Sequence, residues 1–191
     1  MEENIKIIEA LKRVGIAIDD IYDLVNTNKA YPEAIPVLMQ LLKEGVTNVG
    51  NREGIIRALA VPEARGKVGS LLIEEFYKIP SENMLLRWTV GNTMEVVICD
   101  EDIDEVVKIV TDKSNGMSRQ MFALALGKVP SEKSENALIQ VLDDDEIAPH
   151  ALEALGKLKS KKARDKILEL TSHSKSLIKK EAKKALKKIQ Y

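Results

Sequence analysis

A short pattern recurs five times along this chain at intervals of about thirty residues. Its clearest copy, at 119–127, reads Arg-Gln-Met-Phe-Ala-Leu-Ala-Leu-Gly, and residues 148–156 read Ala-Pro-His-Ala-Leu-Glu-Ala-Leu-Gly in the same frame. Related copies begin at residues 52, 87 and 179, so successive copies start 35, 32, 29 and 31 residues apart. Repeats of this length indicate stacked supersecondary units, each of which buries its apolar face against its neighbours.

Each copy has the periodicity of a helix. Apolar or small residues fall at offsets +3, +6 and +7 from the start, as in Phe122, Ala125 and Leu126, and this spacing places them on one helical face. A second amphipathic run precedes every copy, at residues 35–42, 68–73, 103–110, 137–142 and 163–170. The sequence therefore predicts an all-α fold whose unit is helix, turn, helix.

The whole chain, residues 1–191, is predicted to form one domain. Residues 32–191 carry about five repeats, whereas residues 1–31 do not follow the pattern and read as an N-terminal helical cap. Ser81 and Asp145 are candidate N-caps of second helices. Gly127 and Gly156 are placed where a left-handed residue could end a helix.

The composition is that of a globular protein with a helical core. Hydrophobic residues make up 45%, charged residues 31% and aromatic residues only 4% of the chain, which favours helices over sheets. Cys99 is the single cysteine, which fits a reducing compartment. No signal-peptide pattern and no apolar run of about 18 residues is evident. We therefore expect a cytoplasmic protein that does not enter a membrane.

The net charge of −1 conceals a marked asymmetry. Residues 157–191 contain thirteen basic and three acidic residues, and residues 1–156 contain sixteen basic and twenty-seven acidic ones. Nucleic acid could bind through the lysines of the last helix, which are Lys179, Lys180, Lys183, Lys184 and Lys187. The only aromatic residue interleaved with them is Tyr191, so a solvated end cap is the favoured interpretation.

The frame at 119–127 and 148–156 resembles the HEAT-repeat superfamily, and in particular the short HEAT-like repeats found in phycobilisome lyases. The resemblance covers residues 32–190 and implies a right-handed α-α superhelix, a HEAT/armadillo-type solenoid whose second helices line a concave surface. It also implies binding to other proteins rather than chemistry. In HEAT repeats an Asp in the turn within the repeat often pairs with a basic residue that begins the second helix. Asp112 and Arg119 occupy these places.

The candidate partner-binding residues lie at offsets 0, +1 and +5 of the second helices, which we expect to face solvent. These residues are Arg52, Glu53, Arg57, Arg87, Trp88, Asn92, Arg119 and Gln120; the same offsets give Leu124, Ala148, Pro149 and Glu153 further along. The arginines at offset 0 should form a column with Trp88, the only tryptophan, beside it. Tryptophan with arginine is a frequent composition of binding hot spots. In the competing interpretation, the arginines bridge turn carboxylates and Trp88 fills a gap.

No set of residues indicates catalysis, a cofactor or a metal site. His150 and His173 have no ligand at metal-binding spacing, Cys99 has no neighbouring His, and the acidic run at 100–105 lacks the pattern of an EF-hand. We therefore predict a non-enzymatic scaffold or adaptor for an unidentified protein partner. Two alternatives remain: a nucleic-acid-binding protein similar to HEAT-like DNA alkylation repair glycosylases, and an inhibitor or immunity-type protein whose acidic body faces a basic toxin.

Overall fold

The computed structural model describes residues 2–189, which form helices joined by short turns, with no strand among them. The α-helices are α1 (Glu2–Lys12), α2 (Tyr22–Val25), α3 (Ala34–Glu44), α4 (Val49–Ala58), α5 (Gly69–Lys78), α6 (Met84–Val97), α7 (Ile103–Thr111), α8 (Arg119–Leu126), α9 (Glu132–Gln140), α10 (Ala148–Leu158), α11 (Arg164–Leu170) and α12 (Ser176–Ile189). Short 3-10 helices are η1 (Pro62–Ala64), η2 (Asp100–Asp102), η3 (Lys113–Ser118) and η4 (Val141–Asp143). Within residues 2–189, no helix has the length and apolar character needed to cross a membrane.

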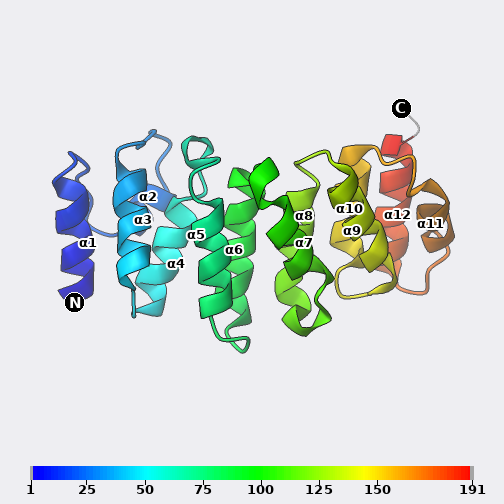
Figure 1. Ribbon diagram of the computed structural model, residues 1–191, viewed down its shortest axis with the longest axis horizontal. Coiled ribbons are helices and arrows are strands. Elements are labelled where there is room, and N and C mark those ends of the chain that lie inside the picture. Colours follow the sequence, from blue (N-terminus) through cyan, green and yellow to red (C-terminus); the bar gives the residue numbers. More distant parts are fainter. Residues whose placement is uncertain (1, 190–191) are drawn as a thin grey trace.

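The helices form a row in which successive pairs follow the chain order from one end of the molecule to the other (Figure 1). From α3 onward they pack as five pairs: α3 with α4, α5 with α6, α7 with α8, α9 with α10, and α11 with α12. The second helices also pack in succession, α4 on α6, α6 on α8, α8 on α10 and α10 on α12. Every copy of the sequence pattern lies on a second helix, so the predicted helix-turn-helix units and their register are confirmed.

The buried core follows the predicted offsets. Residues at +3, +6 and +7 are buried in the first four second helices; these are Ile55, Ala58, Leu59, Val90, Thr93, Met94, Phe122, Ala125, Leu126, Ala151, Ala154 and Leu155. In α12, Ala182 and Ala185 are buried and Leu186 is half-buried. Burial of this continuous apolar stripe is the main favourable contribution to folding, at roughly 25 cal/mol per Å² of apolar surface.

Gly127 and Gly156 serve packing rather than the left-handed helix ends that we expected. Gly127 has a φ of −68°, and Gly156 lies inside α10, whose left-handed C-cap is Lys159. A Cβ on Gly127 would lie 2.8 Å from the Cα of Ala154, and one on Gly156 would lie 3.1 Å from the Cα of Ala185. The glycines are therefore needed because the next second helix approaches the backbone at these points.

Gly91 likewise allows close packing between second helices, here against bulkier side chains. A Cβ at Gly91 would lie 2.9 Å from the Cβ of Met121 and 2.9 Å from the ring of Phe122. The Phe122 ring also meets Phe76 edge to face, with the centroids 5.0 Å apart. A glycine on α6 thus makes room for the large side chain that α8 carries at offset +3.

The predicted N-caps are wrong by position. Helix α6 is capped by Asn83, whose side chain accepts a hydrogen bond from the N–H of Leu86, and not by Ser81. Helix α10 begins after Ile147, which gives no side-chain cap, while Asp145 pairs with Lys175 instead. In both cases the N-cap lies two residues after the expected position, at Asn83 rather than Ser81 and at Ile147 rather than Asp145.

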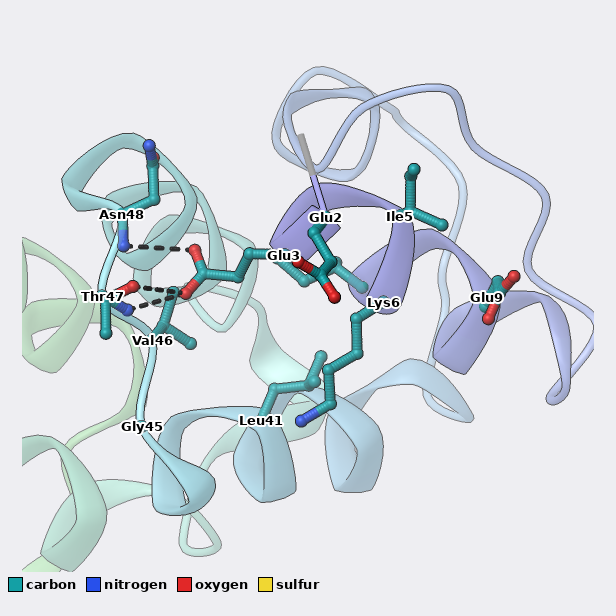
Figure 2. Close-up of a pocket in the computed structure, with 11 residues that line it drawn as sticks. Glu2, Glu3, Ile5, Lys6, Glu9, Leu41, Gly45, Val46, Thr47 and Asn48 are labelled. Atoms are coloured by element: carbon teal, nitrogen blue, oxygen red, sulfur yellow. Dashed lines mark hydrogen bonds between the residues drawn. The ribbon is translucent and has the colours of Figure 1, made fainter.

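Residues 2–31 contain two helices, α1 and α2, which precede the five pairs. Helix α1 packs on α3 and is fastened by Glu3, whose carboxylate accepts hydrogen bonds from the N–H groups of Thr47 and Asn48 and from the Asn51 side chain. Figure 2 shows this carboxylate at the start of α4, on the wall of a cavity of about 720 Å³ between α1 and the α3–α4 turn. Negative charge is favoured at a helix N-terminus.

Candidate functional site

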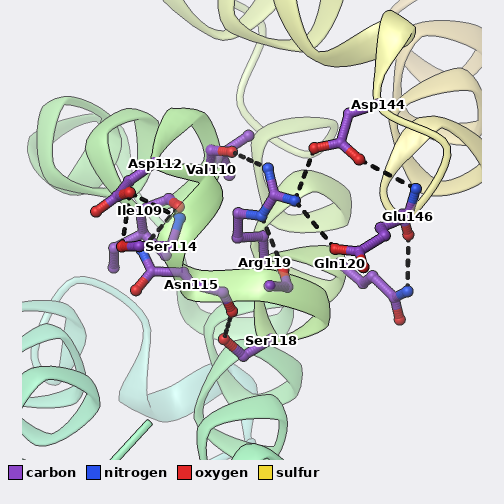
Figure 3. A network of polar contacts seen from close by, with 11 residues as sticks. Ile109, Val110, Asp112, Ser114, Asn115, Ser118, Arg119, Gln120, Asp144 and Glu146 are labelled. Atoms are coloured by element: carbon purple, nitrogen blue, oxygen red, sulfur yellow. Dashed lines mark hydrogen bonds and ion pairs between the residues drawn. The ribbon is translucent and has the colours of Figure 1, made fainter.

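Arg119 begins α8 and is almost wholly buried, with 1% of its surface exposed. Its Nε donates to the carbonyl of Gly116 at 2.8 Å, its Nη1 to the carbonyl of Val110 at 3.4 Å, and its Nη2 to Asp144 at 2.8 Å. Figure 3 shows the guanidinium at the centre of this network, between the turn of its own repeat and the turn of the next. A buried guanidinium is tolerated because its donors are satisfied and its charge is paired.

The carboxylate partner of Arg119 differs from the one we expected. Asp112 accepts hydrogen bonds from the backbone and side chain of Ser114, and the ion pair is made by Asp144 from the following repeat. Burial raises the pKa of Asp144, but hydrogen bonds from Arg119 and from the N–H of Glu146 outweigh it, so the pKa lies below its usual value. The ion pair therefore joins two successive repeats rather than the two helices of one.

Arg52 and Arg87 occupy the same offset as Arg119, and both also form hydrogen bonds with neighbouring helices and turns. Arg52 on α4 donates twice to Glu75 on α5, at 2.9 and 2.5 Å. Arg87 on α6 donates to the carbonyl of Ile79 at 2.9 Å and contacts Asn115 at 3.4 Å. The competing interpretation, in which the arginines bridge turn carboxylates, therefore fits Arg119 and Asp144, whereas Arg52 meets a carboxylate within α5 and Arg87 contacts a carbonyl and an amide.

The expectation that offsets 0, +1 and +5 face solvent is wrong for the third and fourth repeats. Arg119, Leu124, Ala148 and Pro149 are buried. The physical reason is that residues at the start of a second helix meet the turn of the following repeat, which covers offset 0. Across the first three repeats, the arginine column faces the next unit rather than an open groove.

The remaining predicted residues are half-buried and keep part of their surface in solvent. Arg57 and Glu53 form an ion pair one turn apart on α4, with nitrogen–oxygen distances of 2.8 and 2.7 Å. Gln120 donates from its amide to the carbonyl of Glu146 at 2.8 Å, and Asn92 lies further along α6. Exposed pairs of this kind contribute little to stability.

Trp88 lies at an apolar surface pocket of about 380 Å³. The pocket is lined by Met84, Leu85 and Trp88 from α6 and by Met117, Ser118 and Gln120 from η3 and α8. Three of these apolar side chains are largely exposed: Leu85 by 66%, Met84 by 53% and Met117 by 50%. Met84, Leu85 and Trp88 stand at positions i, i+1 and i+4, which places them on one side of the helix.

Sequence reasoning found Trp88 and Gln120 but missed Met84, Leu85 and Met117. A signal for two of them was present: Leu85 and Met117 both stand at offset −2 of their repeats, just before the residues we considered. The same offset gives Leu177 in the last repeat, which is 56% exposed. Apolar residues at this offset precede the core stripe, so the rule for buried positions did not include them.

A chain of ion pairs links the far ends of three second helices. Glu95, near the end of α6, forms ion pairs with Lys128, beyond α8, at 3.7 Å and with Lys157 on α10 at 3.4 Å. Lys157 also pairs with Glu153 at 3.0 Å. Glu95 and Lys157 belong to units two apart in the row, so this ion pair spans the unit that contains α8.

The candidates for chemistry do not assemble. Burial, together with hydrogen bonds to Glu101 and Asp102, raises the pKa of the Cys99 thiol to about 12, so the thiol stays protonated at neutral pH. Burial lowers the pKa of His150, while His173 contacts Asp145 in another part of the row. Among residues 2–189, no group of three or more His, Cys, Asp or Glu side chains is placed to hold a metal ion.

Comparison with known proteins adds no relative to this description. Neither the models of protein families nor the curated proteins give a match to the sequence.

Proposed function

We propose that this chain is a HEAT-type α-solenoid that serves as a non-enzymatic, cytoplasmic scaffold or adaptor, and that it binds a protein partner at the apolar pocket around Trp88. The pocket is the observation that carries the proposal. Apolar side chains of this size, exposed together on one surface, are typical of protein interaction sites. Tryptophan and methionine are also enriched in the buried centres of such interfaces.

The packing supports the solenoid part of the proposal. The second helices contact one another in succession, and Gly127 and Gly156 allow the closest approaches between them. The ion pair between Glu95 and Lys157 spans two units, which is what a row curved toward its second helices would bring about. Such curvature would give the right-handed superhelix with a concave surface that the resemblance implies.

The pocket suits a partner that inserts one large apolar side chain. Its volume of about 380 Å³ is divided between two successive repeats, with Trp88 on one and Met117 on the other. Methionine adapts its shape to the group that it meets. The amide of Gln120 and the Arg57–Glu53 pair offer polar contacts on neighbouring second helices, where the rim of an interface is expected.

The arginine column gives less support to the nucleic-acid alternative than the sequence did. Arg52, Arg87 and Arg119 all donate hydrogen bonds within the chain, so they are engaged in holding repeats together. Phosphate contacts usually come from basic side chains that can reach outward. We therefore base the proposal on the apolar pocket alone.

The test is affinity capture from native lysate, comparing wild type with the variant Leu85→Ala/Trp88→Ala. We expect at least one specific protein to be lost with this variant. The matched control is Leu177→Ala, which shortens a leucine at the same offset and of similar exposure outside the pocket. Because Trp88 is the only tryptophan, its fluorescence should shift to shorter wavelength when the purified partner is added. Retention of every captured protein by the double variant would overturn the proposal.

A further inference from the structure

The last helix carries a set of lysines that differs from the other basic residues near the C-terminus. On and around α11, basic side chains pair with acids of the preceding repeat: Lys166 with Asp143 at 2.6 Å, and Lys162 with Glu132 at 3.7 Å. On α12, Lys184 pairs with Glu181. Within residues 2–189, no carboxylate lies within 4.0 Å of the side-chain nitrogens of Lys179, Lys180, Lys183, Lys187 and Lys188.

Lys180, Lys183 and Lys187 are exposed and Lys179 is half-buried, whereas the side chain of Lys188 packs beside Gly156 of α10. The buried stripe of α12 consists of Ile178, Ala182, Ala185 and Ile189, which contact the preceding helices α10 and α11. At 3.6 residues per turn, Lys180, Lys183 and Lys187 lie on the opposite side of the helix. Ser176 and five lysines, namely Lys179, Lys180, Lys183, Lys184 and Lys187, line a shallow groove of about 330 Å³ there.

The register of the repeat indicates what such a face would meet. Lys179 stands at the same offset as Arg52 and Arg119, which reach carboxylates of the following hairpin, Glu75 and Asp144. The hairpin α11–α12 is the last in the described chain, at one end of the row (Figure 1). Lys179 therefore occupies the position from which the first and third repeats bind an acidic side chain of the next unit.

We propose that the lysine face of α12 binds an acidic helical segment of a partner protein, which packs where a further hairpin would lie. Lys179, Lys183 and Lys187 recur every four residues, about 6 Å apart along the helix axis. Carboxylates at the same interval on a second helix would match them. Complementary charges of this kind fix the register of two helices and speed their encounter. This surface is separate from the pocket at Trp88.

Charge and composition favour an acidic protein helix over nucleic acid. Among the residues that the structure describes, the lining of this face contains lysine but no arginine or aromatic side chain that could stack on a base. Residues 99–156, which precede this end of the row, contain thirteen acidic and five basic residues. An extended polyanion would be repelled where it ran over that region, whereas a short helix would be confined to the lysine face.

The experiment uses two labelled probes and the full chain. One probe is an amphipathic helical peptide of about 20 residues with glutamate at every fourth position; the other is a mixed-sequence single-stranded DNA of the same length. Binding is measured by fluorescence anisotropy at low and at physiological salt. The test variant is Lys180→Glu/Lys183→Glu/Lys187→Glu. The control variant, Lys43→Glu/Lys67→Glu/Lys113→Glu, makes the same change in net charge with exposed lysines on other hairpins.

We expect the acidic peptide to lose at least tenfold in affinity with the α12 variant and less than twofold with the control. A peptide with lysine in place of glutamate should bind the α12 variant better than the control variant; because the two variants have the same net charge, a non-specific effect of net charge would not produce this difference. Thermal melts followed by circular dichroism should be alike for all three proteins, because the substituted lysines are exposed.

Three results would overturn the proposal. The first is an absence of peptide binding to wild type at 100 μM protein, or binding that the α12 variant leaves unchanged. The second is tighter binding of the DNA probe through the same lysines, which would assign the face to nucleic acid. The third is a dimer of wild type in sedimentation that the α12 variant abolishes, which would assign the face to a second copy of the chain. None of these results depends on Trp88, so the proposed scaffold function is tested separately.

Discussion

The starts of α8 and α6 carry an arginine at the same place in the repeat, yet the two regions differ in what they expose. Arg119 on α8 is sealed by Asp144 and by the carbonyls of Val110 and Gly116. Arg87 on α6 meets an asparagine amide of the next repeat instead of a carboxylate, at 3.4 Å. Its guanidinium lies over the ring of Phe76, 4.8 Å from the centroid.

The residues around the two arginines also differ in burial, and those around Arg119 are the more enclosed. From Ser118 to Gly127 every residue except Gln120 is buried, so α8 is almost wholly enclosed by the stack. On α6, Met84 and Leu85 are exposed and Trp88 is half-buried. One register position can therefore hold repeats together or leave an apolar surface open, and the side chain supplied by the next turn decides which.

The largest expected effect is that of Arg119→Ala. The substitution would leave Asp144 and two carbonyls without their main donor and create a cavity, so we expect a loss of about 3–5 kcal/mol in the free energy of unfolding. Arg87→Ala should cost only about 1–2 kcal/mol, because one good hydrogen bond and one cation–π contact are lost. Urea unfolding followed by circular dichroism measures both. Equal losses would show that the two regions do not differ as described.

The next largest effect is expected at Gly91, where α6 packs against α8. A methyl group at this position would lie 2.9 Å from Phe122 and from Met121, and overpacking of this kind costs about 1–3 kcal/mol. Gly91→Ala should therefore destabilise the fold although alanine favours helices. Phe122→Leu should suppress part of that loss in the double variant, since the smaller side chain relieves the contact. Additive losses would mean that the two residues do not meet.

The repeat frame predicted most of this architecture, because the spacing of apolar residues has only one helical solution. The buried positions at offsets +3, +6 and +7 could be predicted from this spacing alone. What the frame could not supply is the direction of polar side chains at the repeat boundaries. Whether Arg119 meets Asp112 or Asp144 depends on how far the next turn reaches, and both carboxylates fit the sequence.

The site was predicted less well for a related reason. Trp88 was identified because it is the only tryptophan. Met84, Leu85 and Met117 were overlooked because the periodic pattern identifies buried positions and says nothing about exposed apolar residues. The role of Gly127 could not be foreseen either, since a glycine at a helix end has two uses. Its φ of −68° and its distance to Ala154 identify close packing rather than a left-handed turn.

A smaller effect is expected from pH. The pKa of Asp144 is depressed in the folded protein, so its contribution to stability is complete above the unfolded pKa of about 3.9 and is lost as the pH falls through the folded value. In Asp144→Asn this contribution is absent at every pH. Thermal melts between pH 6 and pH 2 should therefore show a steeper fall in Tm for wild type than for the variant. Parallel curves would mean that the Arg119–Asp144 pair does not hold the carboxylate ionised.

The smallest effect should come from Leu85→Ala in the region around Trp88. Because 66% of Leu85 is exposed, little apolar surface is uncovered by its removal, and alanine is at least as good a helix former. We expect the free energy of unfolding to change by less than about 0.5 kcal/mol, whereas Leu124→Ala on the enclosed α8 should cost about 2 kcal/mol or more. Urea unfolding of the two variants gives the comparison directly. A loss near 2 kcal/mol for Leu85→Ala would place Leu85 in the core and remove the apolar pocket as a surface free for a partner. A negligible loss would leave a variant in which binding can be measured without any change in folding.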